Sequence, residues 1–465
     1  MSDLSVNDVV WDASVYPRQK WNTSTIERYA EAMRSGAVFP PITVEEGTNR
    51  LLDGKHRLEA YKKAIEQPGM NGEAPAELRV EAVAAPSDIP VKMFAASLSN
   101  EHGDRLSLAD LRAVVREAYA DNPGLRQEDV ARRFRIRRQA VSEMVSDILA
   151  REREERAGKA LRLSMLGHTQ RAIAAALGVS ADTANKDLSD FADSGIFGQG
   201  HAPEEIARRY GLPLAVVHAK LLEGKNDQER LKHLGIKVQP YDVWHFTSCH
   251  DLMGDKHPGR IPGELVCHTL YFYTQPGDLV IDPMAGSGTT LDAALLMGRK
   301  ARGYDIDHRH DRIDIERRNL DDGWPEATKS AALVFWDPPY FDKMDQGTIG
   351  SDGYIKGSVS GRTPDEYLAW FGARFTELRG VVNPGTRLAF LMSDWDPENA
   401  KRHKDSAGIF VWDYADVLRE AGWKIERQIQ TPLSTQQVHP DIVNKFRESR
   451  RLARLGRYLL IARPA

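Results

Sequence analysis

The stretch from Leu279 to Thr290 restricts the fold of this chain more than any other part. It reads Leu-Val-Ile-Asp-Pro-Met-Ala-Gly-Ser-Gly-Thr-Thr. An apolar run of strand character, a turn with Gly286 and Gly288, and a helix from Thr289 to Met297 predict a strand, loop and helix unit. Such a unit brings backbone close to a ligand at the carboxyl end of a parallel strand. Glycine loops of this kind serve many nucleotides, so the loop alone does not select a function.

A second motif, Asp337-Pro338-Pro339-Tyr340, ends the apolar run from Ala332 to Trp336. Two adjacent prolines end a strand and hold the backbone extended, so a carboxylate, a carbonyl and an aromatic ring are fixed beside one another. A strand-ending turn with a solvated aspartate would explain the same residues. The glycine loop earlier in the chain favours a catalytic role.

Together the two motifs resemble those of the DNA amino-methyltransferases. The loop from Asp282 to Gly288 is similar to the family's S-adenosylmethionine loop, and Asp337 to Tyr340 is similar to its catalytic motif. The resemblance covers about residues 236–465 and implies an α/β Rossmann-like methyltransferase domain. It also implies double-stranded DNA as substrate, with the target base flipped out of the duplex. An aspartate at the first motif position favours adenine N6, and cytosine N4 stays open.

The resemblance also assigns roles to residues. An exocyclic amine is a poor nucleophile because its lone pair is delocalised into the ring; Asp337 and the Pro338 carbonyl would accept its N–H bonds, and Tyr340 would stack on the base. The catalytic candidates are Asp337, Pro338, Pro339 and Tyr340. The cofactor-binding candidates are Asp282, Pro283, Met284, Gly286, Ser287, Gly288, Thr289 and Asp305. Asp305 is favoured over Asp307 for the ribose hydroxyls, because it ends the next predicted strand. The glycine-rich loop from Phe341 to Arg362 is expected to close over the site.

In the first hundred residues, helix and strand signals alternate around Gly54-Lys55-His56-Arg57. Gly54, Lys55 and Arg57 are a candidate phosphate site, because a helix start offers free N–H groups and a favourable dipole. A glycine turn with solvated cations explains the pattern equally well. Phe39-Pro-Pro-Ile, Asp53 to Arg57 and Ser99-Asn-Glu-His-Gly103 resemble the ParB/sulfiredoxin-like domain, an α+β fold. That resemblance implies a nucleotide triphosphate at this domain, DNA binding and a homodimer.

A helical pattern recurs three times between Leu106 and Gly235. Each copy has an alanine, an apolar residue three positions later, a turn residue and an apolar anchor on a second helix, which is the spacing of a helix-turn-helix. The turn residues are Arg135, Gly178 and Gly211, and the anchors are Val141, Ala184 and Val217. A helical bundle with coincident alanines is the alternative for any single copy. Three copies in register favour an all-α helix-turn-helix array.

The polar residues distinguish the three copies. In copy one the candidate DNA contacts are Arg132, Arg133, Arg137, Arg138 and Gln139, which suit phosphates and base edges. In copy two they are Thr183, Asn185 and Lys186. Copy three has Pro213 and a mostly apolar second helix, so we expect it to pack.

The whole chain is therefore expected to be multidomain: a ParB/sulfiredoxin-like domain at 1–103, the helical array at 104–235 and the methyltransferase domain at 236–465. Removing residues 1–235 should then abolish DNA binding or the choice of DNA sequence and leave cofactor binding intact. The net charge of −4 makes local arginine clusters more informative than the total. Two cysteines, and the lack of an apolar leader or membrane-length segment, favour a reducing, cytoplasmic location without a membrane partner.

No metal is expected, because the histidines and cysteines between His245 and His268 lack the usual ligand spacings. A rival function is a ParB-like regulatory or partition protein whose methyltransferase fold acts as a sensor. The intact Asp337 motif argues against that rival. Methylation of RNA is disfavoured, because the helical repeats are of a DNA-binding type and no RNA-binding module is recognisable.

Overall fold

The computed structural model describes residues 4–18, 21–67, 74–99, 106–246, 248–256, 260–307, 312–341, 359, 362–395, 397, 406–433, 440–450, 452 and 455–465. The chain divides into two compact units, Met1–Arg153 and Glu154–Ala465. The boundary lies inside one long helix, α6 (Arg138–Met165). The predicted helical array is therefore divided between the two units, and the three-region division stays a prediction.

The first unit is α+β in composition, as expected. Its elements are η1 (Val6–Asp8), α1 (Thr23–Arg34), β1 (Ile42–Glu45), β2 (Leu51–Asp53), α2 (Lys55–Glu66), β3 (Val80–Val83), α3 (Val91–Ser99), α4 (Leu108–Asp121), α5 (Gln127–Phe134) and the start of α6. The sheet has the order β2-β1-β3, with β1 antiparallel to β2 and parallel to β3. One core lies between this sheet and α1 and α2, and a second joins α3 and α4 to α5 and α6.

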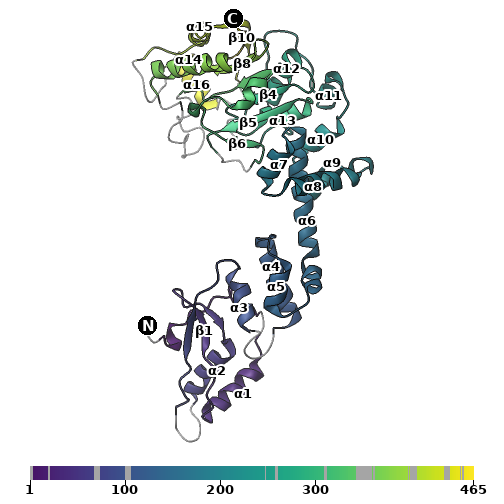
Figure 1. The fold of residues 1–465 in the computed structure, drawn as a ribbon. Helices are drawn as coiled ribbons and strands as arrows, with labels where there is room; N and C mark the ends of the chain where they lie inside the picture. Colours follow the sequence, from purple (N-terminus) through teal and green to yellow (C-terminus); the bar gives the residue numbers. More distant parts are fainter. Residues whose placement is uncertain are drawn as a thin grey trace. The chain divides into compact units, whose positions relative to one another are not determined.

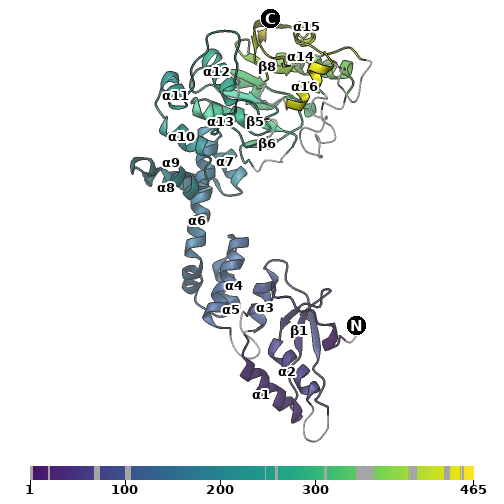
Figure 2. The ribbon, with the colours of Figure 1, turned by 180° about the vertical axis from the view of Figure 1, so that it is seen from behind.

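The second unit begins with helices and ends with a large sheet. Its elements are the end of α6, α7 (Gln170–Leu177), α8 (Ala181–Asp193), η2 (Ile196–Gly198), α9 (Pro203–Tyr210), α10 (Leu214–Leu221), α11 (Asp227–His233), α12 (Gly263–Tyr273), β4 (Leu279–Asp282), α13 (Thr289–Leu296), β5 (Lys300–Asp305), β6 (Ile315–Arg317), η3 (Leu320–Asp322), η4 (Glu326–Ser330), β7 (Leu333–Trp336), α14 (Pro364–Val381), β8 (Arg387–Ser393), α15 (Val411–Glu420), β9 (Trp423–Gln430), α16 (Pro440–Glu448) and β10 (Arg457–Pro464). They can be followed in Figure 1 and, from behind, in Figure 2.

The predicted helix pairs form at all three repeats. They are α5 with α6, α7 with α8, and α9 with α10. The turn residues Arg135, Gly178 and Gly211 have φ of 55°, 65° and 58°, the left-handed conformation that closes a tight turn. The three anchors on the second helices are buried. The helix pairs are thus confirmed as structure, and their binding to DNA stays a prediction.

The seven-stranded sheet has the order β6-β5-β4-β7-β8-β10-β9. Strands β6, β5, β4, β7 and β8 are parallel, whereas β10 is antiparallel to both of its neighbours. The chain passes outward through β5 and β6 on one side of β4, then returns to β7 on the other side. The order therefore reverses between β4 and β7, which makes their carboxyl ends the expected ligand position in a doubly wound sheet.

Successive residues of the central strands point to opposite faces of the sheet. Val280 and Leu333 belong to a core shared with α10, α12 and α13, whereas Ile281 and Val334 belong to a core shared with α14 and α15. Both faces are covered, which explains why the parallel strands read as continuous apolar runs. This arrangement confirms a Rossmann-like α/β domain.

Helices from the predicted array are part of this second unit. The end of α6 meets β5, where Arg302 donates to the carbonyls of Leu166 and Gly167 at 2.6 and 2.7 Å. Arg230 of α11 donates to the carbonyl of Leu296 at the end of α13. These arginines satisfy helix-terminal carbonyls that the helices cannot satisfy themselves. Residues 154–235 therefore stabilise the same core as the sheet.

Among the described residues, no helix combines the length and apolar character needed to cross a bilayer.

Candidate active site

The two sequence motifs meet at the point where the sheet order reverses. Val280 pairs with Leu333 and Ile281 with Val334, so Asp282 and Asp337 leave adjacent parallel strands at the same edge. The two carboxylates are close enough for Asp337 to contribute to the raised pKa of Asp282. The structure thus brings together two motifs that are separated in sequence by α13, β5 and β6.

The glycine loop is fastened to the end of β5. Ala285 N–H donates to the carbonyl of Tyr304, and Gly286 N–H donates to Asp305 Oδ2, both at 2.8 Å. Asp305 Oδ1 accepts from the Asp307 N–H at 2.8 Å. Asp305 is partly exposed, and its carboxylate stands at the end of β5 next to the glycine loop.

Asp282 has a different position from the other loop residues. Its side chain is 3% exposed and accepts from the Met284 N–H at 3.0 Å and from Thr290. Burial, before any other cause, raises the pKa of Asp282 to about 7. The carboxylate therefore joins the loop to α13. Of the predicted cofactor-binding residues, Met284, Gly286 and Asp305 keep exposed surface, whereas Pro283, Ser287, Gly288 and Thr289 are buried.

A buried network of arginines and aspartates holds the glycine loop in place. Arg312 donates to the carbonyl of Ser287 at 2.9 Å and packs where a Cβ on Gly288 would lie. Arg312 and Arg162 of α6 share the carboxylates of Asp292 and Asp314 at 2.7 to 3.3 Å. The positive charges of the two arginines cancel the negative charges of the two aspartates. Charged groups are tolerated in a protein interior only when they are paired in this way. Gly288 is thus required both for its φ of 81° and for the space that Arg312 fills.

The Asp337 carboxylate lies in a largely enclosed setting. Tyr340 donates its hydroxyl hydrogen to Asp337 Oδ1 at 2.7 Å. Burial raises the pKa of Asp337 to about 6, while the Tyr340 hydrogen bond and the charge of Arg457 oppose that rise. Asp337 is therefore ionised at neutral pH and can accept hydrogen bonds from an amine.

The turn that carries these residues is held by α14 and by aromatic packing. The Tyr367 hydroxyl donates to the carbonyl of Pro339 at 2.7 Å and accepts from the Phe341 N–H at 3.2 Å. Phe341 has a φ of 42°, an uncommon value that its buried ring, packed on Tyr367 and Trp395, maintains. No described residue donates to the Pro338 carbonyl, so this acceptor stays available beside Asp337.

Tyr367 and Arg457 are the site residues that sequence analysis missed. Tyr367 lies on α14, which begins with a capping box of Thr363 and Glu366. Arg457 is the first residue of the last strand, β10. No local pattern marks either residue, because each reaches the motif through tertiary structure.

Part of this site is similar to a known family of proteins. Residues 207–315 match the family model described as DNA methylase. The segment is similar to DNA methylases. It contains the glycine loop and Asp305 and ends before Asp337, so the match does not test the catalytic candidates.

Curated relatives match about a fifth of the chain. DNA adenine methyltransferase YhdJ of Escherichia coli is 33% identical over 98 residues, which are 21% of this chain and 32% of the relative. Orphan methyltransferase M.BamHII of Bacillus amyloliquefaciens is 29% identical over 109 residues, which are 22% of this chain and 40% of the relative. The chain thus spans about a third of the first relative and two fifths of the second.

Solved structures align only loosely. TrmN from Thermus thermophilus gives a TM-score of 0.27 and 15% identity over 45% of this chain and 50% of that chain. A geranyl diphosphate methyltransferase in complex with SAM gives a TM-score of 0.29 and 16% identity over 44% of this chain and 86% of that chain. The fold assignment therefore rests on the sheet order described above.

The predicted DNA contacts lie in different units. Arg132, Arg137, Arg138 and Gln139 are exposed in the first unit, and Arg133 is partly exposed. Arg132 and Arg138 pair with Asp129 and Glu128, at 3.4 and 3.0 Å. In the second unit, Thr183 and Asn185 are partly buried on α8, and Lys186 is exposed. Copy one therefore presents the stronger basic surface, whereas α10 of copy three packs in the core, as expected.

The predicted phosphate site at the start of α2 is changed by the structure. Arg57 is buried and donates to the carbonyls of Pro40 and Pro41 and to Asp53 Oδ2, at 2.7 to 3.1 Å. These contacts hold Arg57 in the fold, and a phosphate site at Gly54, Lys55 and Arg57 stays a prediction. Lys55 pairs with Glu59 at 2.8 Å.

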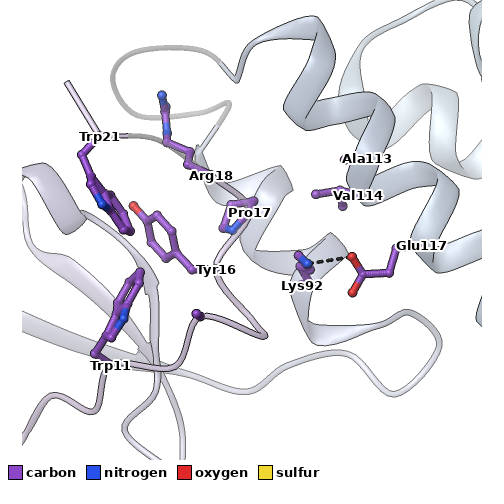
Figure 3. A pocket seen from close by; sticks show the side chains of 10 residues that line it. Trp11, Tyr16, Pro17, Arg18, Trp21, Lys92, Ala113, Val114 and Glu117 are labelled. Atoms are coloured by element: carbon purple, nitrogen blue, oxygen red, sulfur yellow. Dashed lines mark hydrogen bonds and ion pairs between the residues drawn. The ribbon is translucent and has the colours of Figure 1, made fainter.

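A pocket of about 280 Å³ lies nearby in the first unit. Figure 3 shows Trp11, Tyr16 and Trp21 beside one another on its wall, with Lys92 paired to Glu117 across it. The Lys55 ammonium lies 4.1 Å from the Trp11 ring centroid. A nucleotide triphosphate at this domain stays a prediction.

Some expectations lie outside the described residues. They concern Asn100 to Gly103 of the ParB-like pattern and most of the glycine-rich loop between Phe341 and Arg362.

Proposed function

We propose that the chain is a DNA methyltransferase that transfers a methyl group from S-adenosylmethionine to an exocyclic amine, with adenine N6 as the target and cytosine N4 as the alternative. One observation carries the proposal. Asp337 and the Pro338 carbonyl lie beside the glycine loop at the reversal point of a doubly wound sheet. A doubly wound sheet binds its ligand at this point. Here, groups that can accept hydrogen bonds from an amine lie next to a glycine loop of the kind that binds nucleotides.

The loop residues fit this cofactor. Gly286 is exposed with a φ of 47°, and a Cβ added there would meet no other atom, so the loop leaves open space above its backbone. Asp305 stands at the edge of that space with acceptor capacity for ribose hydroxyls, and Met284 offers an adaptable apolar surface. The bound cofactor would supply an activated methyl on a sulfonium, whose C–S electron pair stays on sulfur when the methyl leaves.

The protein's own groups prepare the amine. Asp337 Oδ2 and the Pro338 carbonyl accept the two N–H bonds, which draws the nitrogen toward tetrahedral geometry and frees its lone pair for the new N–C bond. The proton lost from nitrogen passes to Asp337 and then to water. Tyr340 supplies a ring for stacking on the flipped base, whose removal from the duplex costs a few kcal/mol. The exposed arginines of copy one supply phosphate contacts.

Asp337→Asn is the decisive variant, because it keeps the shape of the side chain and removes its charge. We expect methyl transfer from labelled cofactor to mixed-sequence duplex DNA to fall by about 100-fold or more, the usual contribution of a positioned acid or base. Binding of S-adenosylhomocysteine should be unchanged, because the loop residues are intact. The exposed Asp416→Asn is the matched control and should behave as the wild type.

Mass spectrometry of the digested DNA identifies the product. Methyladenine supports the N6 assignment, and N4-methylcytosine supports the alternative. A wild-type protein that binds the cofactor and transfers no methyl to any duplex would contradict the proposal. It would favour the hypothesis of a ParB-like regulatory or partition protein.

A further inference from the structure

Arg457 places a positive charge close to the catalytic motif. It belongs to the last strand of the sheet, β10. Arg457 is the first residue of β10 and pairs with Ser393, the last residue of β8. Because β10 runs antiparallel to β8, its first residue lies at the edge where the parallel strands end. A parallel strand in this position would place its first residue at the opposite edge. The reversed strand therefore delivers a guanidinium to the active edge.

Arg457 is held in a buried position near the Tyr340 hydroxyl. Its side chain is 6% exposed, and Nε donates to the carbonyl of Thr431 at 2.8 Å. Its charge lowers the pKa of the Tyr340 hydroxyl against the rise caused by burial, which places the guanidinium near that hydroxyl. Tyr340 in turn donates its hydrogen to Asp337 Oδ1 at 2.7 Å. Because an arginine can only donate, it acts on Tyr340 through the hydroxyl oxygen. Arg457, Tyr340 and Asp337 thus form a chain of neighbouring groups.

We propose that Arg457 is a positioning residue for methyl transfer, acting through the Tyr340 hydroxyl on the Asp337 carboxylate; this rests on the proposed function. The chain fixes the plane of the carboxylate and occupies Oδ1. No described residue is hydrogen-bonded to Oδ2, so this oxygen is left for the amine. The same contacts fix the Tyr340 ring in the orientation from which it meets the base.

The charge of Arg457 has a second consequence. A carboxylate removed from water favours its neutral form unless a cation compensates, and a neutral Asp337 is a weaker acceptor for the amine. Arg457 and the Tyr340 hydrogen bond lower the pKa of Asp337 against the rise caused by burial. The Tyr367 hydroxyl and the Asp282 carboxyl, whose pKa burial raises to about 7, also face Asp337. Removing the guanidinium should therefore move the acid limb of the rate profile to higher pH.

The test measures single-turnover methyl transfer to duplex DNA between pH 5.5 and 8.5, with the full chain. The wild-type acid limb is expected near pH 6. For Arg457→Met we expect that limb to move up by about one pH unit, which costs about five-fold in rate at pH 6 and little at pH 8.5. Arg457→Lys should give a smaller upward shift, because lysine keeps the positive charge. Some shift should remain, because a point charge cannot hold two acceptors in one plane.

Two further variants separate this role from a structural one. Tyr340→Phe keeps the ring and breaks the chain, so it should shift the limb upward, and Arg457→Met should add less to that shift than it gives alone. Arg463→Met removes an exposed arginine at the other end of β10, where it pairs with Glu426, and should leave the profile unchanged. A rate that falls equally at every pH in Arg457→Met, with the acid limb unmoved, would overturn the proposal.

A direct titration keeps the test independent of activity. The Asp337 carboxyl resonance, assigned with Asp337→Asn in protein labelled with ¹³C-aspartate, should titrate at higher pH in Arg457→Met than in the wild type. If the wild type transfers no methyl, the proposed function fails while this titration still decides whether Arg457 acts on Asp337. An unshifted titration in both Arg457→Lys and Tyr340→Phe would overturn the proposal even if Arg457→Met did not fold.

Discussion

At the scale of single residues, two glycines of one loop have opposite environments. Gly286 is exposed, with open space where a Cβ would be, whereas Gly288 faces the Arg312 guanidinium. The sequence motif treats them alike because it records only residue type. The structure distinguishes Gly286, which faces open space, from Gly288, whose missing side chain leaves room for the Arg312 guanidinium.

Substituting each glycine by alanine should therefore give different defects. Gly288→Ala should destabilise the fold by about 3 kcal/mol or more, since a left-handed alanine costs about 1–2 kcal/mol and Arg312 must also leave its buried anions. Gly286→Ala, at a φ of 47° in open space, should cost only the backbone strain of about 1–2 kcal/mol and weaken the binding of S-adenosylhomocysteine. Thermal unfolding and calorimetric titration measure the two effects. Gly277→Ala, at a φ of 88° in open space, is the control for backbone cost alone; a Gly288→Ala protein no less stable than this control would contradict the clash.

At the scale of elements, buried ion pairs connect α6 to the glycine loop. Arg162 lies on α6, and its partners Asp292 and Asp314 also hold Arg312 under Ser287. All four side chains are almost fully buried. Losing one cation therefore leaves an uncompensated anion that water cannot reach.

Arg162→Met should lower the free energy of unfolding by about 3–5 kcal/mol, measured by urea denaturation. Arg162→Met combined with Asp314→Asn should recover part of this loss, because Arg312 and Asp292 then balance. Arg209→Met, which breaks an exposed pair with Glu154, should cost about 1 kcal/mol or less. Equal losses in Arg162→Met and Arg209→Met would show that burial of the network does not matter.

At the scale of the whole molecule, the boundary between the two compact units lies inside α6, at Arg153. The sequence predicts that removing residues 1–235 leaves cofactor binding intact. The structure shows that α9, α10 and α11 contribute Tyr210, Val216 and Leu231 to the core that also contains α13. A cut at residue 235 would expose that core, and a cut at the unit boundary would not.

We therefore expect a fragment of residues 154–465 to unfold cooperatively and bind S-adenosylhomocysteine, and a fragment of residues 236–465 to do neither. The longer fragment lacks the copy-one arginines, so its DNA affinity should be lower and less dependent on salt than that of the full chain. Circular dichroism, calorimetry and fluorescence anisotropy at several salt concentrations measure these properties. Unchanged DNA affinity would move the principal DNA contacts to the second unit.

Local chemistry explains what the sequence could predict. The strand, glycine loop and helix at Leu279–Met297 and the turn residues of the helix pairs depend on neighbours within a few positions, and each forms as expected. The apolar run from Ala332 to Trp336 likewise sufficed to predict β7. Short strand β6 and helix α15 were missed, because neither carries a comparable local signal.

The sequence by itself determined which groups the candidate site contains: a glycine loop, and a carboxylate next to a carbonyl that two prolines hold in place. It also determined the basic helix pair of the first unit. Only the tertiary structure decided how the groups of the site are arranged. It brought Arg457 to the edge of the sheet where Asp337 lies by reversing one strand, buried Arg57 in contacts with the fold, and placed two of the three helix pairs in the same unit as the seven-stranded sheet. Each of these outcomes depends on partners far apart in the chain, and burial and charge balance between such partners exist only after folding.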